Sequence, residues 1–213
     1  MAARRPARRQ RADARRNRSR ILAAAAEVFG EMGAEGGVAE IARRAGVGHA
    51  TVFRHFPTKD ALLVALTGAR MEELADRADA EATREPHGEG LERFMAHLAE
   101  RMADDRGVVE VSTRAHAFTP ELADQRRLLH SRVGVLLRIA HTAGRARGDL
   151  RPEDVFMLCA AVGQTARESL AAPNLWRRYL TIVLDGVRTA APTRLPVAAP
   201  DLTDLEAHAH PTD

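Results

Sequence analysis

The side chains best suited to chemistry in this chain are nine histidines and a single cysteine, Cys159. Most of the histidines fall in the middle of the chain or near its end: His97, His116, His130, His141, His208 and His210. None is spaced from a cysteine or a carboxylate as a compact metal site requires. Ser131 and Ser169 lack the sequence context of a catalytic nucleophile. We therefore expect no metal, no cofactor and no catalytic residue, and the sequence argues against an enzyme.

Basic side chains gather in the first part of the chain. Residues 1–60 hold 13 Arg and Lys against 6 Asp and Glu (+7), whereas the remainder holds 19 against 23 (−4), which gives the whole chain +3. Such a segment suggests a polyanion such as nucleic acid as its partner. A basic tail with no role in reading sequence would carry the same charge, so the charge alone leaves both interpretations open.

Nothing in the sequence points to export or to a membrane. One cysteine cannot form an internal disulfide framework, and no run approaches the roughly 18 apolar residues of a membrane span. No apolar stretch of signal-peptide character follows the arginines at the start of the chain. We expect a cytoplasmic protein that does not bind membranes.

The elements that must position these residues are helices. Hydrophobic residues make up 45% of the chain and aromatic residues only 4%, and the apolar positions recur at helical spacing almost throughout. The pattern predicts an all-α fold of nine helices. Gly33 and Gly46 should end the first two, residues 49–55 should form the third, and Thr58 should cap a long fourth. A short sixth helix is expected over residues 108–116.

Two domains are expected between two tails. Residues 17–60 should form a small N-terminal domain and residues 61–189 a larger helical one. Residues 1–16 are rich in arginine, and residues 190–213 contain four prolines. Neither segment can bury much apolar area, so we expect both to be disordered.

The most informative segment is VAEIARRAGVGHATVFRHF, residues 38–56. Ala42 is small where two helices must cross closely, and Gly46 stands where a turn needs a left-handed backbone. Six residues later, Val52 is apolar where the next helix must anchor in the core. This spacing fits a helix-turn-helix that binds DNA, although an ordinary helical hairpin would satisfy it too.

The stretch EIARRAGVGHATVFRHFPTKDALL strongly resembles the DNA-binding signature of the TetR family of bacterial regulators, and the preceding RSRILAAAAEVFGEMGA is similar to that family's first helix. Further on, GDLRPEDVFMLCAAVGQTA and WRRYLTIVLDGVR resemble the C-terminal helices of an actinobacterial-type subgroup. The resemblance implies a nine-helix TetR-like architecture and a homodimer on a palindromic double-stranded DNA operator. It also implies a repressor that a small molecule releases from DNA.

The resemblance further implies which residues contact DNA. They lie at the end of the second helix, in the recognition helix and at the start of the fourth: Arg43, Arg44, Gly48, His49, Ala50, Thr51, Phe53, Arg54, His55 and Lys59. The family usually has Ser where Gly48 stands, Gly where Ala50 stands and Tyr where Phe53 stands. Fewer neutral phosphate contacts are therefore expected, and the arginine-rich arm would compensate through counterion release.

Base reading is expected early in the recognition helix, at His49 and Ala50, with Arg44 nearby. An arginine can bind guanine with two hydrogen bonds, and an alanine can touch a thymine methyl group. Arg43 and Arg44 would equally suit phosphate contacts alone, so both interpretations of these arginines stay open.

A small, mostly apolar effector is expected to bind among the fourth, fifth, seventh and eighth helices. The candidate residues combine apolar walls with a few polar groups: Met71, Phe94, His97, Leu98, Met102, Phe118, His130, Val133, Cys159, Gln164 and Arg167. The methionines and aromatic residues would also make an ordinary core. Two other classes therefore stay open, an architectural DNA-binding protein without an effector and an enzyme or carrier that borrowed the helix-turn-helix.

The dimer interface is expected on the last two helices, residues 152–171 and 175–189, whose apolar stripes are long. Small residues at Ala160, Gly163 and Gly186 would let helices approach closely. The stripes could instead pack only within one subunit.

Overall fold

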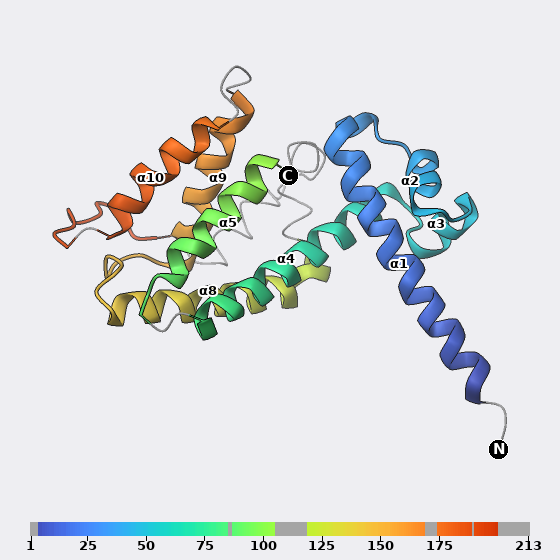
Figure 1. Ribbon diagram of the computed structural model, residues 1–213, viewed down its shortest axis with the longest axis horizontal. Helices are drawn as coiled ribbons and strands as arrows, with labels where there is room; N and C mark the ends of the chain where they lie inside the picture. Colours follow the sequence, from blue (N-terminus) through green and yellow to red (C-terminus); the bar gives the residue numbers. More distant parts are fainter. Residues whose placement is uncertain (1–3, 85–86, 105–118, 169–173, 189, 200–213) are drawn as a thin grey trace, which may run out of the picture. The chain divides into compact units, whose positions relative to one another are not determined.

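The computed structural model describes residues 4–84, 87–104, 119–168, 174–188 and 190–199. These residues form no strand; their eight α-helices are α1 (Arg4–Met32), α2 (Val38–Ala45), α3 (His49–His55), α4 (Lys59–Arg84), α5 (Gly90–Asp104), α8 (Ala123–Thr142), α9 (Pro152–Glu168) and α10 (Leu175–Arg188) (Figure 1). Short 3-10 turns, η1 (Gly33–Glu35) and η2 (Pro120–Leu122), follow α1 and precede α8. The all-α prediction is confirmed, and the expected sixth helix at 108–116 lies outside the described residues.

Two compact units make up the described chain, and the division falls between Thr67 and Gly68, inside α4. In the first unit, α1 packs against α2, and α2 against α3. Its core is built from apolar side chains that are almost fully buried: Ile21, Ala25, Val28, Phe29, Ile41, Val52, Phe56, Leu62 and Leu66. These are the positions that recur at helical spacing along each of the four segments, as an amphipathic stripe requires.

Glycines end the helices of the first unit where the sequence predicted. Gly33 follows the last residue of α1 with φ of 55°, and Gly46 follows α2 with φ of 61° and ψ of 40°. A side chain at such a left-handed residue is strained, which is why glycine is favoured there. Thr58 also caps α4 as expected, because its Oγ1 accepts a hydrogen bond from the Ala61 amide at 3.0 Å.

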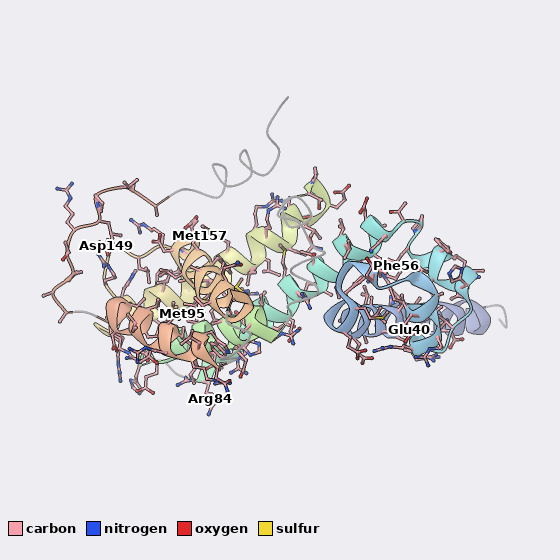
Figure 2. All side chains as sticks on the ribbon, turned by 90° about the horizontal axis from the view of Figure 1, so that it is seen from above. Glu40, Phe56, Arg84, Met95, Asp149 and Met157 are labelled. Atoms are coloured by element: carbon pink, nitrogen blue, oxygen red, sulfur yellow. The ribbon has the colours of Figure 1, made fainter. Side chains whose placement is uncertain are left out.

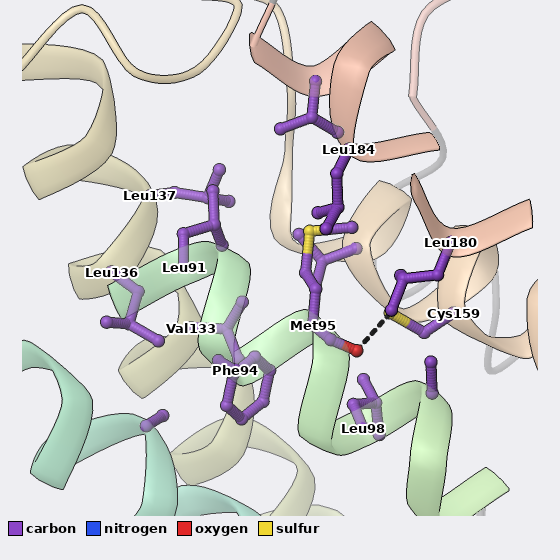
Figure 3. Packing of buried hydrophobic residues seen from close by; sticks show 14 of the residues in the cluster. Leu91, Phe94, Met95, Leu98, Val133, Leu136, Leu137, Cys159, Leu180 and Leu184 are labelled. Carbon is purple, nitrogen blue, oxygen red and sulfur yellow. Dashed lines mark hydrogen bonds between the residues drawn. The ribbon is translucent and has the colours of Figure 1, made fainter. Parts of the chain in front are cut away.

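The second unit is a helical bundle around one apolar cluster, to which α5 contributes the centre. Leu91, Phe94, Met95 and Leu98 of α5 pack among side chains of α8, α9 and α10, which include Val133, Leu136, Leu137, Cys159, Leu180 and Leu184 (Figure 3). The approach of α5 and α9 is close, since a Cβ added at Gly163 would lie 2.7 Å from the Cβ of Met102. Gly163 therefore serves packing inside one subunit.

The two ends of the chain differ from the expected disordered tails in part. Residues 4–16 form the first turns of α1, whereas the sequence analysis expected a disordered arm over residues 1–16. Alanine, arginine and glutamine are good helix formers, and Pro6 lies in the first turn, where its missing N–H is tolerated. Residues 190–199 are not helical, and the guanidinium of Arg147 donates a 2.7 Å hydrogen bond to the Thr193 carbonyl.

Candidate nucleic-acid interface

One face of α3 is anchored in the core, and the other is open to solvent. Val52 is 1% exposed and holds the helix against the first unit. The open face carries residues that were predicted to contact DNA: His49, Ala50, Phe53 and Arg54 are exposed, and Thr51 and His55 are half-buried. The structure thus brings these predicted residues together on one short helix.

An exposed aromatic side chain marks this open face. Phe53 is 43% exposed, and its ring meets the imidazole of His49 edge to face, with the ring centroids 5.0 Å apart. Phe53 and His49 are one helical turn apart, so each limits the rotamers of the other. A pre-ordered imidazole at the first residue of α3 is well placed to donate or accept a hydrogen bond at a DNA surface.

The turn before α3 is held by backbone and by a side chain of α1. The Gly46 amide bonds to the carbonyls of Ala42 and Arg43, and the Arg20 guanidinium donates to the Gly46 carbonyl at 3.3 Å. Gly48 then takes an extended conformation, and its carbonyl accepts the amide of Thr51 at 2.8 Å. The chain is therefore fixed from the end of α2 to the first turn of α3.

The two arginines near the end of α2 are both paired with carboxylates. Arg43 bonds to Glu40 through two nitrogens at 2.7 and 2.6 Å. Arg44 bonds to Glu40 at 2.8 Å and to both carboxylate oxygens of Glu31 at 2.8 and 2.5 Å. The hydrogen bonds from Arg43 and then Arg44 lower the pKa of Glu40 to about 2, and the bond from Arg44 lowers the pKa of Glu31.

Arg44 is therefore less open to DNA than Arg43. The Arg44 side chain is 22% exposed, against 71% for Arg43. The prediction that one of them reads bases remains untested, but the geometry assigns Arg44 a partner on α1 that sequence spacing did not suggest.

Lys59 begins α4 and is half-buried, with its ammonium 5.4 Å from the centre of the Phe29 ring. On α1, Arg18 lies in the same way 5.1 Å from the ring of Phe56. Cation–π contacts of this kind hold a basic side chain near an apolar surface. Lys59 remains a predicted phosphate contact.

The side chains that the sequence analysis missed are the ones that hold the motif together, namely Arg18, Arg20, Glu31 and Glu40. Glu40 stands three and four residues before Arg43 and Arg44, a helical spacing that predicts ion pairs. Arg18, Arg20 and Glu31 lie on α1, far in the sequence from their partners Phe56, Gly46 and Arg44, and no local spacing reveals such pairs.

Most of the apolar residues predicted to line an effector pocket gather in the core of the second unit. Phe94, Leu98, Val133 and Cys159 are at most 2% exposed, and the half-buried Met71 and Met102 pack against the same cluster. The Cys159 thiol lies 3.6 Å from the Met95 carbonyl, and burial raises the pKa of this thiol to about 12 (Figure 3). In this structure these side chains therefore pack as a core.

The polar residues predicted for the pocket are dispersed. His97 lines a surface cavity of about 410 Å³ beside Trp176 and Leu180. The Nε2 of His130 lies 2.7 Å from a carboxylate oxygen of Glu153, although the ring N–H is not aligned for a hydrogen bond. Gln164 is exposed on α9. Phe118 and the side chain of Arg167 lie outside the described residues.

Within the described residues, no group of three His, Cys, Asp or Glu side chains is placed to hold a metal ion. No helix in the described part of the chain is long and apolar enough to cross a membrane.

A short helix that follows a left-handed glycine turn and exposes a polar and aromatic face, in a small unit linked to a helical bundle, defines a helix-turn-helix DNA-binding protein. Comparison with known proteins gives the family. Residues 21–66 match the family described as bacterial regulatory proteins of the tetR family, and residues 85–189 match the C-terminal domain of SbtR-like transcriptional regulators.

Solved structures and curated sequences agree with these matches. A TetR transcriptional regulator from Streptomyces coelicolor is 32% identical with a TM-score of 0.65, over 82% of this chain and 99% of that one. A TetR regulatory protein from Mycobacterium vanbaalenii is also 32% identical, with a TM-score of 0.64 over 84% and 99%. An HTH-type transcriptional repressor from Mycobacterium tuberculosis is 33% identical over 57% of this chain and 65% of its own length.

The chain belongs to the TetR family of transcriptional regulators. It is a DNA-binding regulator and not an enzyme, as the sequence predicted. The matched segment spans 65% of the length of the curated repressor.

Proposed function

We propose that this regulator is a repressor that binds a near-palindromic operator as a homodimer and is released by a small, mostly apolar effector. The observation that carries the DNA-binding part is the open face of α3, where His49, Ala50, Phe53 and Arg54 are exposed together while Val52 is buried. A rigid helix with one such face fits the major groove of DNA, and two copies related by symmetry would read two half-sites.

The experiment that tests this part is selection of genomic fragments by the purified protein, followed by sequencing. A recovered motif with two inverted half-sites, about one helical turn apart from centre to centre, is expected. His49→Ala should change the preferred bases. Lys59→Ala should weaken binding to all duplexes alike. It should also reduce by about one the slope of the logarithm of the binding constant against the logarithm of the salt concentration. Recovery of fragments with no shared motif would contradict sequence-specific regulation and favour an architectural role.

The proposed dimer interface lies on α9 and α10. Three large apolar side chains there are open to solvent, namely Met157 (50%), Tyr179 (40%) and Ile182 (56%). Ala160 and Gly186 are exposed on the same two helices. Apolar side chains left open on adjacent helices are typical of surfaces that a second copy covers.

Ile182→Glu tests this interface better than a change at Val183, because Val183 is half-buried against the subunit's own core. The variant should sediment as a monomer and lose affinity for a two-half-site duplex while keeping its helical content. Leu128→Glu, at a 44% exposed residue of α8, is the matched control and should remain dimeric. Dimers of Ile182→Glu would move the interface elsewhere.

The proposed effector site is the cluster around Met71, Phe94 and Met102. Residues of α4, α5, α8 and α9 meet there, and methionine side chains repack readily around a guest. Helix α4 runs without a break from Lys59 to Arg84, so a ligand that shifts it would act on the residue that begins the helix at the DNA-binding unit. Release requires that the ligand prefer the conformation with low DNA affinity.

Titration of apolar metabolites against a labelled protein–operator complex tests this site. Met71→Trp and Met102→Trp should weaken release at least about tenfold by filling the space that the ligand needs. Leu128→Trp, at an exposed position on α8 outside the proposed interface, should leave release unchanged. A releasing compound whose effect is the same in all three variants would place the ligand elsewhere. The absence of any releasing compound would favour an architectural protein.

A further inference from the structure

Three charged side chains, Glu31, Glu40 and Arg44, form a hydrogen-bonded group that connects α1 with α2. Arg44 of α2 reaches back to Glu31, thirteen residues earlier, near the end of α1. The same guanidinium also bonds to Glu40, one turn earlier in its own helix. Glu40 lies on α2 (labelled in Figure 2).

A second arginine, Arg20, connects α1 with the turn that follows α2. Arg20 donates to the carbonyl of Gly46, the residue that ends α2 and starts the turn into α3. A cation at the C-terminus of a helix is favoured by the partial negative charge of its free carbonyls. The end of α2 is thus held from α1 at two points, by Arg20 and through Arg44.

The Arg44 guanidinium is committed to these carboxylates. It makes three hydrogen bonds of 2.5 to 2.8 Å, two of them to the two oxygens of Glu31. Paired hydrogen bonds from a planar guanidinium to both oxygens of a carboxylate fix the relative orientation of the two groups. An arginine held in this way has little freedom to turn its guanidinium toward a base.

We propose that Arg44 is a positioning residue: clamped by Glu31 and Glu40, it sets the orientation of α2, and through the Gly46 turn that of α3, and it does not contact DNA itself. Sequence discrimination therefore depends on an ion pair that lies outside the DNA-contacting surface. This inference rests on the proposed function, since it concerns how the recognition helix is aimed.

The alternative is that Arg44 contacts DNA, and exchanging the two charges separates the cases. Arg44→Glu should lower the ratio of affinities for the selected operator and for a scrambled duplex by about fivefold or more, because three carboxylates then repel one another. The double variant Glu31→Arg with Arg44→Glu should recover at least half of that loss on a logarithmic scale. Recovery is incomplete because Glu40 stays one helical turn from the carboxylate introduced at position 44.

Arg43 provides the matched control. It carries the same charge one residue earlier, is 71% exposed, and bonds to Glu40 and not to Glu31. Adding Glu31→Arg to Arg43→Glu should therefore restore none of the loss in the affinity ratio that Arg43→Glu causes alone. If the exchange at Arg44 also fails to restore the ratio, Arg44 contacts DNA and the proposal is wrong.

Thermal unfolding of the same variants without DNA tests the clamp independently of the function. The melting temperature of the exchanged double variant should exceed the value expected from adding the two single changes. Additive melting temperatures would mean that the clamp does not exist in solution. Non-additive melting temperatures, combined with a genomic selection that yields no operator motif, would leave the clamp in place and contradict the proposed function instead.

Discussion

The two units of this regulator hold their helices together in different ways. In the second unit, residues of five helices, α4, α5, α8, α9 and α10, close around one apolar cluster in which Phe94 and Met95 are 0% exposed. In the first unit, the apolar core is supplemented at its edge by arginines that cross between helices, Arg20 to Gly46 and Arg44 to Glu31. A unit made of α1, two short helices and the start of α4 has less apolar area to bury, so specific polar contacts matter more to its geometry.

This difference predicts where each unit is sensitive. A bundle held by apolar packing responds to the volume of its buried side chains and little to its surface charges. In a unit where charged contacts orient a short helix, the loss of a single ion pair can alter that orientation while the overall stability stays nearly unchanged. Variants that fold normally and yet bind DNA differently should therefore be found among substitutions in the first unit.

Phe94→Ala should have the largest effect on stability. The ring is fully buried at the centre of the second unit, and its removal should cost about 3–5 kcal/mol in the free energy of unfolding, as measured by urea denaturation. Leu128→Ala, at a 44% exposed position of α8, should stay within about 0.5 kcal/mol of the natural protein. Similar losses in both variants would mean that the second unit has no dominant core.

Gly163→Ala should come next, because the added methyl group would lie 2.7 Å from the Cβ of Met102. Pushing α9 away from α5 should cost about 1–3 kcal/mol in the free energy of unfolding. Gly134→Ala on α8 is the control, since its Cβ would meet no atom closer than 3.7 Å. If Gly163→Ala is as stable as Gly134→Ala, the two helices approach less closely than described.

Gly46→Ala should destabilise the first unit by about 1–2 kcal/mol, because the residue has φ of 61° and its Cβ would fall 2.6 Å from the Arg20 guanidinium. Gly30→Ala, inside α1 with no atom near its Cβ, should stabilise the protein by about 0.5–1 kcal/mol. Calorimetric melting of both variants measures the contrast. Opposite signs are expected, and a neutral Gly46→Ala would argue against a left-handed turn.

The smallest effect should come from pH acting on Glu40. Its pKa is lowered to about 2 by hydrogen bonds from Arg43 and Arg44, so the ionised carboxylate favours the folded state above the unfolded pKa near 4.5. That contribution disappears as the pH falls through the folded value. The melting temperatures of the natural protein and Glu40→Gln should therefore differ at pH 6 and converge toward pH 2. A difference that is constant with pH would exclude the ion pairs as its source.

Much of the first unit could be predicted from the sequence because its signals are local. Gly46 and Gly33 marked helix ends, residues 49–55 gave the bounds of α3, and Thr58 gave the cap of α4. Each depends on a residue type and a short spacing, which are visible in one dimension. The clamp of Arg44 by Glu31 depends on how α1 and α2 cross. Two residues thirteen apart in the sequence have no fixed spatial relation before these helices pack together.

The predicted pocket shows a related limit in the second unit. Periodicity correctly placed Phe94, Leu98, Val133 and Cys159 on inward faces, but an inward face is equally suited to a core or to a cavity. The difference depends on how well side chains from separate helices fill the space between them. The start of α1 over residues 4–16 has no apolar stripe in the sequence to signal it, since a helix that is already formed can extend without one.

The continuous α4 has a further consequence, which concerns proteolysis. Lys59 is the only lysine in the sequence, and it is the first residue of the helix in which the two units divide. A lysine-specific endoprotease therefore has a single bond to cut, and it can do so only when the first turn of α4 and the cap from Thr58 open. The rate of that one cleavage therefore measures local unfolding at the start of α4, and a gel follows it as the appearance of two fragments of unequal size.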